Sequence, residues 1–92
     1  MDLKELRQEI DATDRQIVAL FEKRMEISER IASCKQQAGM PVRDETREAE
    51  KIAQVQSFAH TDFCKENIGE LFTLLMALSR KLQEEKKKTT LQ

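Results

Sequence analysis

The sequence predicts an all-α fold of three helices, one of them very long, and three observations lead to it. Charged residues make up 36% of the 92 residues, with two Gly and one Pro, a composition typical of helices rather than sheets. Apolar residues recur three and four positions apart over two long stretches, which is the period of an amphipathic helix. The first stretch is too long for a small globular monomer to cover, which indicates association with a second chain.

The first helix is predicted over residues 2–38, because its apolar seam meets no Gly or Pro before Gly39-Met40-Pro41. About 35 residues give a helix of about 50 Å, whereas a compact domain of this length is only about 32 Å across. The helix therefore overhangs any globular monomer, and we expect a dimer or a larger assembly. The seam has heptad spacing and consists of Leu3, Leu6, Ile10, Thr13, Ile17, Leu20, Arg24, Ile27, Ile31 and Cys34.

Two further helices are predicted over residues 44–58 and 62–86. Asp44 is a good N-cap for the second helix, and a loop from Ala59 to Asp62 separates it from the third. The third helix carries the second apolar stretch, and the lysine-rich tail to residue 92 is expected to fray. Residues 1–92 are thus interpreted as one helical domain. The apolar positions of the third helix are Cys64, Ile68, Leu71, Leu75, Leu78 and Leu82.

Composition argues against several classes of function. The formal net charge of −1 provides no field for nucleic acid or an anionic membrane, and no stretch resembles a signal peptide or a membrane span. We therefore expect a cytoplasmic protein. The single histidine, His60, is expected in a loop, and Cys34 and Cys64 are expected in the core. No metal site, phosphate loop or nucleophile with an adjacent base is indicated.

The most informative residue is Arg24, a permanent cation within the apolar seam. A buried unpaired charge is strongly unfavourable, so Arg24 calls for a carboxylate from another helix or from a ligand. Lys35 follows eleven residues later on nearly the same side, about 16 Å away along the axis. The two side chains could close around a small molecule with two carboxylates. Taken alone, Lys35 is better explained as an exposed cation near a helix end.

Other polar residues border the apolar faces. Arg7 lies on the same side of the first helix as Lys35, four heptads earlier, and about 25 Å from Arg24 along the axis. It could therefore reach the same ligand only from the other chain of an antiparallel dimer. Its alternative explanation is a surface ion pair. The second helix presents one face of mixed charge and the third presents neutral hydrogen-bonding groups beside its stripe. These residues are Asp44, Arg47, Glu48 and Lys51 on the second helix, and Ser79 and Gln83 on the third.

Taken together, these residues resemble those of the all-helical chorismate mutases. The resemblance extends from Leu3 to about Glu85 in matching order, and the full set is far more specific than any single member. It implies an intertwined homodimer of three-helix chains with two active sites, each of which receives one arginine from the partner. The matching positions are Arg7, Arg24, Lys35, the segment Pro41-Val42-Arg43-Asp44-x-x-Arg47-Glu48, and Ser79-x-x-x-Gln83.

The resemblance also implies the catalytic residues. Arg24 and the partner's Arg7 are expected to hold the two carboxylates of chorismate. Lys35 and Gln83 are expected to donate hydrogen bonds to its ether oxygen. The implied reaction is the rearrangement of chorismate to prephenate in phenylalanine and tyrosine biosynthesis. This unimolecular step requires no nucleophile, metal or cofactor, and proceeds by conformational restriction and electrostatic stabilisation.

The remaining implied residues bind the rest of the substrate. Glu48 and the region of Asp44 are expected at the ring hydroxyl, and Arg47 and Ser79 are expected to complete the pocket. Isochorismate-pyruvate lyase and aminodeoxychorismate mutase are alternative enzymes, and a module that senses prephenate or assembles a larger enzyme is a non-catalytic alternative. The sequence leaves open whether the chain acts alone, associates with another shikimate-pathway enzyme or is part of a bifunctional protein.

Overall fold

The structure, a computed structural model, describes residues 2–91, with side chains as far as residue 88. This part of the chain is entirely α-helical in its regular structure, as predicted. It consists of α1 (Leu3–Gln37), α2 (Glu45–Phe58) and α3 (Asp62–Leu91). None of these helices is long and apolar enough to cross a membrane.

Both ends of α1 have recognisable caps. At its start, Asp2 Oδ1 accepts a hydrogen bond of 2.8 Å from the backbone N–H of Glu5. At its end, Gly39 adopts a φ of 69°, the left-handed conformation that glycine takes up without strain. The backbone N–H of Met40 then donates to the carbonyl of Lys35, 2.8 Å away. The predicted stop at Gly39-Met40-Pro41 is confirmed, and the chain turns there towards α2.

Side-chain caps also fix the starts of α2 and α3. Asp44 Oδ1 accepts from the backbone N–H of Arg47 at 2.9 Å, so the predicted N-cap is confirmed. Thr61 Oγ1 accepts from the backbone N–H of Cys64 at 3.1 Å. The end of α3 corrects the predicted boundary near residue 86, because the helix continues to Leu91. Glu and Lys are good helix formers, so the tail needs no apolar stripe to stay helical. Gln92 lies outside the described residues.

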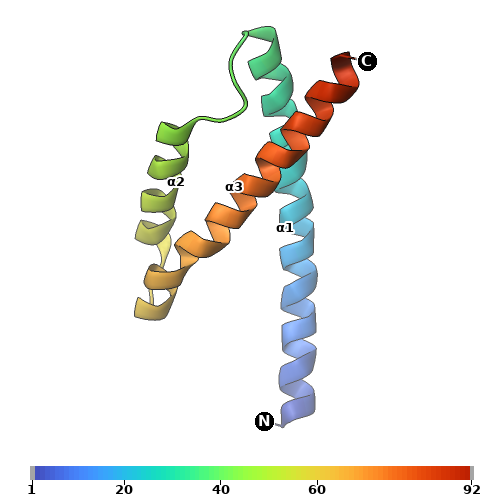
Figure 1. Cartoon of the computed structure of the whole chain (residues 1–92). Coiled ribbons are helices and arrows are strands. Elements are labelled where there is room, and N and C mark those ends of the chain that lie inside the picture. The colour runs from blue at the N-terminus through green and yellow to red at the C-terminus, as the bar shows by residue number, and fades with distance from the viewer. Residues whose placement is uncertain (1, 92) are drawn as a thin grey trace.

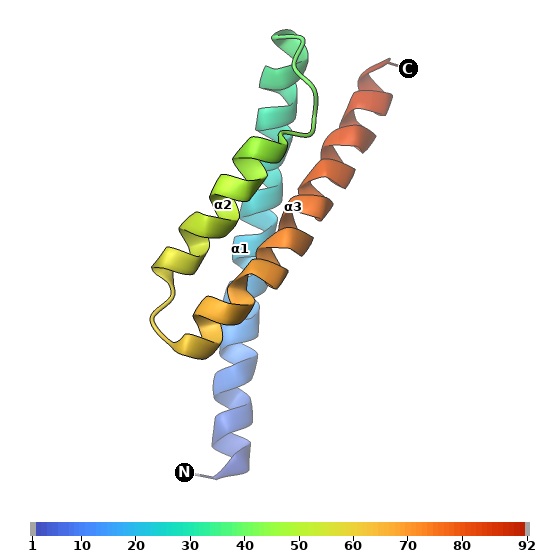
Figure 2. The same ribbon diagram turned by 60° about the vertical axis from the view of Figure 1, so that its left-hand side comes forward.

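The three helices are held together by α3. It packs against both other helices, whereas α1 and α2 do not pack on each other within the described residues. In Figures 1 and 2, α3 crosses the C-terminal half of α1, and the N-terminal turns of α1 extend beyond both other helices. The molecule is 54 Å long with a radius of gyration of 16.6 Å, well above the roughly 12 Å of a compact domain. The expected overhang of the first helix is confirmed.

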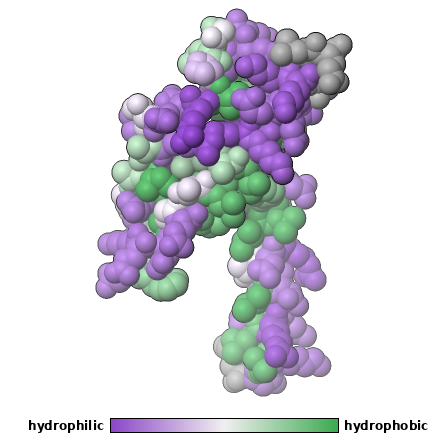
Figure 3. All heavy atoms as spheres, viewed as in Figure 1, coloured by the Kyte–Doolittle hydropathy of each residue, from purple (hydrophilic) through white to green (hydrophobic). Residues whose placement is uncertain are grey.

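The single chain has a very small apolar core. Among residues 2–88, the buried apolar side chains are Val55 and Met76, while Leu3 and Leu20 of the seam are more than 60% exposed. Apolar atoms are visible along α1 below its crossing with α3 (Figure 3). The cysteines depart from the expected core positions: Cys34 is exposed and Cys64 partly exposed in the single chain. Cys34 shares this exposure with Ile27 and Ile31 of the same seam, each of which is 43% exposed.

Candidate active site

A cavity of about 280 Å³ is lined by residues of all three helices and of the loop after α1. It brings together seven of the eight residues predicted for the site, although α1 and α2 do not pack on each other. The eighth, Arg7, is not among its lining residues. The seven are Arg24, Lys35, Asp44, Arg47, Glu48, Ser79 and Gln83.

Arg24 is held at the wall of this cavity by α3. Its Nη1 donates a hydrogen bond of 2.8 Å to Ser79 Oγ, and its guanidinium lies 5.8 Å from the centre of the Phe72 ring. Burial lowers the pKa of the Arg24 guanidinium from its usual value, but arginine remains charged in proteins. None of the carboxylates in residues 2–88 forms an ion pair with it. Its charge is therefore available to an anionic ligand.

A buried network of hydrogen bonds continues from Ser79. Ser28 Oγ donates to Ser79 Oγ at 3.0 Å, and Gln83 Nε2 donates to the carbonyl oxygen of Ser28 at 3.1 Å. Ser28, Ser79 and Gln83 are all less than 9% exposed. Ser79 and Gln83 are four residues apart on α3, and both form hydrogen bonds with the same turn of α1. The network fixes the position of the Gln83 amide, which keeps a second N–H for another acceptor.

Lys35 is likewise held in position by a hydrogen bond to the protein. Its Nζ donates a hydrogen bond of 2.6 Å to the carbonyl oxygen of Val42, in the loop between α1 and α2. The side chain is half-buried, and a protonated amine has three N–H donors. One bond to the protein therefore orients the ammonium and leaves donors for a ligand.

The α2 wall of the cavity carries charges of both signs. Glu48 Oε1 accepts from Arg80 Nη1 of α3, and Lys51 Nζ donates to Gln54 Oε1 at 2.6 Å. Asp44 uses one carboxylate oxygen to cap α2. Around the whole cavity, cationic side chains outnumber acidic ones, because Arg24, Lys35, Arg47, Lys51 and Arg80 face only Asp44 and Glu48. This excess of positive charge suits a ligand with more than one negative charge.

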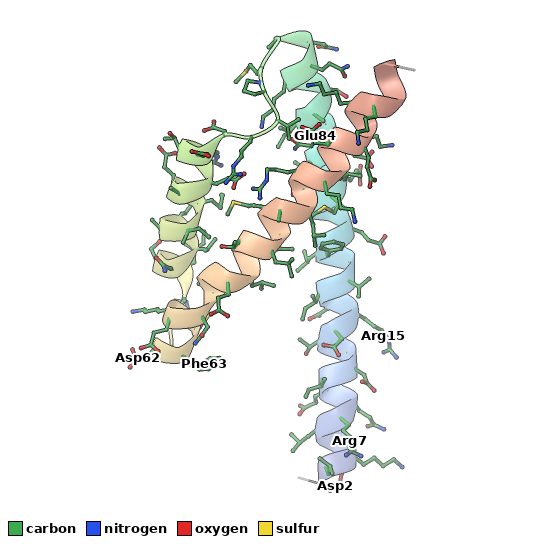
Figure 4. The ribbon with its side chains drawn as sticks, in the orientation of Figure 1. Asp2, Arg7, Arg15, Asp62, Phe63 and Glu84 are labelled. Carbon is green, nitrogen blue, oxygen red and sulfur yellow. The ribbon has the colours of Figure 1, made fainter. Side chains whose placement is uncertain are left out.

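Arg7 lies far from the cavity of its own chain. It is exposed near the free end of α1, away from α2 and α3 (Figure 4). Arg7 and Arg24 are 17 positions apart on the helix, a distance of about 25 Å. The structure therefore does not bring Arg7 to the other seven residues within one chain.

Sequence reasoning missed three groups of the site: Ser28, Arg80 and the carbonyl of Val42. Ser28 follows Arg24 by one helical turn, so its place on the same face could have been found from spacing. Arg80 offered no such signal, because its partner Glu48 is on another helix. The Val42 carbonyl is a backbone group, and only the path of the loop brings it to Lys35.

Comparison with known proteins decides the family. A family model described as chorismate mutase type II matches residues 6–84. The chain belongs to this family. The matched range contains all eight predicted site residues, Arg7 included. In this member of the chorismate mutase family, the matched range also covers the regions where α3 packs on α1 and on α2.

Individual relatives agree with that assignment. The chorismate mutase of Methanocaldococcus jannaschii is 30% identical over 84 residues, which are 90% of this chain and 85% of the relative. The T-protein of Haemophilus influenzae is 42% identical over 55 residues, 60% of this chain, and the match spans only 14% of the T-protein. A solved chorismate mutase (form II) from Thermus thermophilus has a TM-score of 0.84 at 29% identity, over 89% of this chain and 93% of that one.

Proposed function

We propose that this chain is a chorismate mutase that converts chorismate to prephenate. The observation that carries the proposal is the cavity in which Arg24, Lys35 and Gln83 present donors that the protein itself does not fully use. Each is fixed by a hydrogen bond to a neutral oxygen, so its direction is set before a ligand arrives. Donors aimed in advance at developing negative charge are the usual device of electrostatic catalysis.

The proposed roles follow from what each group can donate or accept. Arg24 binds one carboxylate of chorismate, while Lys35 and Gln83 donate to the ether oxygen, on which charge grows as its bond breaks. Glu48 and Asp44 each keep a carboxylate oxygen that can accept from the ring hydroxyl. Arg47 and Ser79 complete the wall.

The reaction itself requires positioning rather than a reactive side chain. The rearrangement is intramolecular, so the protein has to hold the enolpyruvyl arm over the ring and stabilise the charge of the transition state. Cationic side chains of the cavity wall bind the two carboxylates. The buried hydrogen-bond network around Ser79 holds the Arg24 guanidinium in one position for this task. All of these tasks are performed by hydrogen bonds and charges of the kind that line the cavity.

We further propose that the active protein is an antiparallel, intertwined homodimer in which the partner's Arg7 binds the second carboxylate. A groove of about 440 Å³ between α1 and α3 is lined almost wholly by apolar residues, among them Ile17, Leu20 and Leu74. Arg24 borders both this groove and the polar cavity. A helix of a second chain seated in the groove would therefore pass beside Arg24, where an arginine from its N-terminal turns could complete the site.

Two broader predictions from the sequence are kept as proposals: a cytoplasmic location, and association with another shikimate-pathway enzyme. The second is supported by the match to the T-protein, in which a related segment belongs to a much longer chain. The net charge of −1 favours neither nucleic acid nor a membrane as a partner.

The first test is turnover by the purified chain. We expect chorismate to disappear and prephenate to form, and we expect Arg24→Ala to abolish the conversion, because the substitution removes a carboxylate-binding cation from the cavity wall. Loss of chorismate is followed by its absorbance, and the product is identified by mass and by chromatography. A folded wild-type chain that leaves chorismate unchanged, or that releases pyruvate instead, would contradict the proposal.

A second test concerns the donor at the ether oxygen. Gln83 donates at any pH, whereas a glutamate in its place donates only when protonated. Protonation is lost as pH rises, so kcat/KM of Gln83→Glu should fall towards alkaline pH while the wild type changes little over the same range. A pH profile of the variant that is parallel to the wild-type profile would remove Gln83 from the ether contact.

A further inference from the structure

One ion pair of the cavity joins two helices, and its arginine, Arg80, has no role among those proposed so far. Arg80 Nη1 of α3 donates to Glu48 Oε1 of α2, and both side chains are about three-quarters shielded from solvent, at 26% and 22% exposed. The pair between Arg30 and Glu26 is different, since its side chains are 74% and 63% exposed on one helix. An exposed pair of that kind contributes little to stability, whereas a shielded pair beside a cavity restricts where its carboxylate points.

The position of Arg80 on α3 explains why it reaches α2. Successive residues of a helix are turned by about 100°, so Arg80 projects to a different side from Ser79. Ser79 bonds to α1, and Arg80 bonds to α2. The two helices α2 and α3 approach closely at Gly69, where an added Cβ would lie 3.5 Å from Ile52 Cγ2. They diverge from their connecting loop towards the N-terminus of α2 in both views (Figures 1 and 2). Glu48 lies in the first turn of α2 and Arg80 lies in the second half of α3, so the pair is far from the connecting loop.

We propose that Arg80 is a positioning residue that holds Glu48 for the ring hydroxyl of the substrate. This inference rests on the proposed function. A glutamate side chain has several rotatable bonds, and fixing it on a ligand costs conformational entropy. Arg80 binds Oε1 before the substrate arrives, so that Oε2 is left as the acceptor. Arg80 also offsets the repulsion between the Glu48 carboxylate and a substrate with two carboxylates of its own.

The expected effect is on binding rather than on the chemical step. The ring hydroxyl takes no part in the bonds that form and break, so its contact is equally strong in the ground state and in the transition state. Loss of such a contact raises KM and leaves kcat nearly unchanged. For Arg80→Gln we expect KM for chorismate to rise about tenfold or more, the usual scale for a hydrogen bond to a charged group.

The matched control is Lys81→Gln. It removes the same charge from the next residue of α3, which is exposed and outside the cavity, so its KM should equal that of the wild type. Arg80→Lys keeps a cation within reach of the single oxygen that Arg80 contacts, and should restore most of the wild-type KM. Thermal unfolding of all variants shows whether any loss of activity reflects loss of the fold.

A double-mutant cycle with Glu48→Gln isolates the coupling between the two residues. If Arg80 acts through Glu48, then Arg80→Gln should add little to KM once Glu48 has been replaced. The proposal is overturned if KM of Arg80→Gln is unchanged, if kcat falls instead, or if the effects of the two substitutions multiply. Should Arg80→Gln fail to fold, Arg80→Lys decides, since a KM at least tenfold above wild type for a folded Arg80→Lys chain would also overturn it. Failure of the proposed function is distinct, because wild-type protein would then not convert chorismate at all.

Discussion

Replacing Lys35 by alanine is expected to lower kcat by at least about 10²- to 10³-fold, the effect of losing one preorganised donor at a developing charge. Lys35 is held by a 2.6 Å hydrogen bond to the Val42 carbonyl, so its ammonium is already oriented when the substrate binds. Because the proposed contact with the ether oxygen strengthens as the bond breaks, the loss should fall on kcat. Steady-state kinetics of prephenate formation measures it.

The same substitution also removes a hydrogen bond to the loop between α1 and α2, so the control must separate chemistry from folding. Thermal unfolding should show a small loss of stability beside the large loss of turnover. Lys81→Ala removes a lysine outside the cavity and should retain full activity. A kcat for Lys35→Ala close to that of the wild type would show that Lys35 does not touch the reacting atoms.

Mixing two inactive variants is expected to restore activity. Arg7→Ala and Arg24→Ala each remove a carboxylate-binding residue from both sites of a homodimer, so each variant alone should be nearly inactive. In a mixed dimer, one site receives Arg24 from the first chain and the partner's Arg7 from the second, and the other site lacks both. Random exchange makes half of the dimers mixed, so the mixture should recover about a quarter of the wild-type activity.

This experiment distinguishes an arginine supplied by the partner from one supplied within the chain. If Arg7 served the cavity of its own chain, each chain of a mixed dimer would still carry one defect at its site, and no activity would return. Co-expression of the two variants with different affinity tags allows the mixed dimer to be isolated, so its share of the mixture does not have to be assumed. The converse dimer carries Arg7→Ala and Arg24→Ala together in one chain, paired with an intact chain. It should have no working site if Arg7 is supplied by the partner, because each site then lacks one arginine, and one working site if Arg7 acts within its own chain.

Much of the fold could be predicted because the helix ends are determined locally. Asp2 and Asp44 accept hydrogen bonds from N–H groups three residues ahead, and Gly39 takes the left-handed conformation that ends α1. Such interactions are readable from neighbouring residues. The end of α3 was less predictable, since the charged tail has no apolar period, yet the helix continues past residue 86 as far as Leu91.

The candidate site was predictable to the extent that its residues interrupt or border apolar stripes. Arg24 within the seam, and Ser79 and Gln83 beside the stripe of α3, are noticeable on that ground. Arg80 and the Val42 carbonyl were not, because their partners are set by how α3 crosses between α1 and α2. No local spacing describes that crossing. The roles assigned to these residues stay predictions until the variants are measured.

The central position of α3 has a consequence for how sequences with this architecture can diverge. Gly69 packs on α2 near the start of the helix, Ser79 and Gln83 bond to α1 further along, and Arg80 returns to α2. One residue inserted between the first of these points and the others would turn every later side chain by about 100° and separate all of them from their partners at once. Among related sequences, insertions and deletions should therefore be found in the loop between α2 and α3 and be absent from α3 itself, however much the surface residues differ.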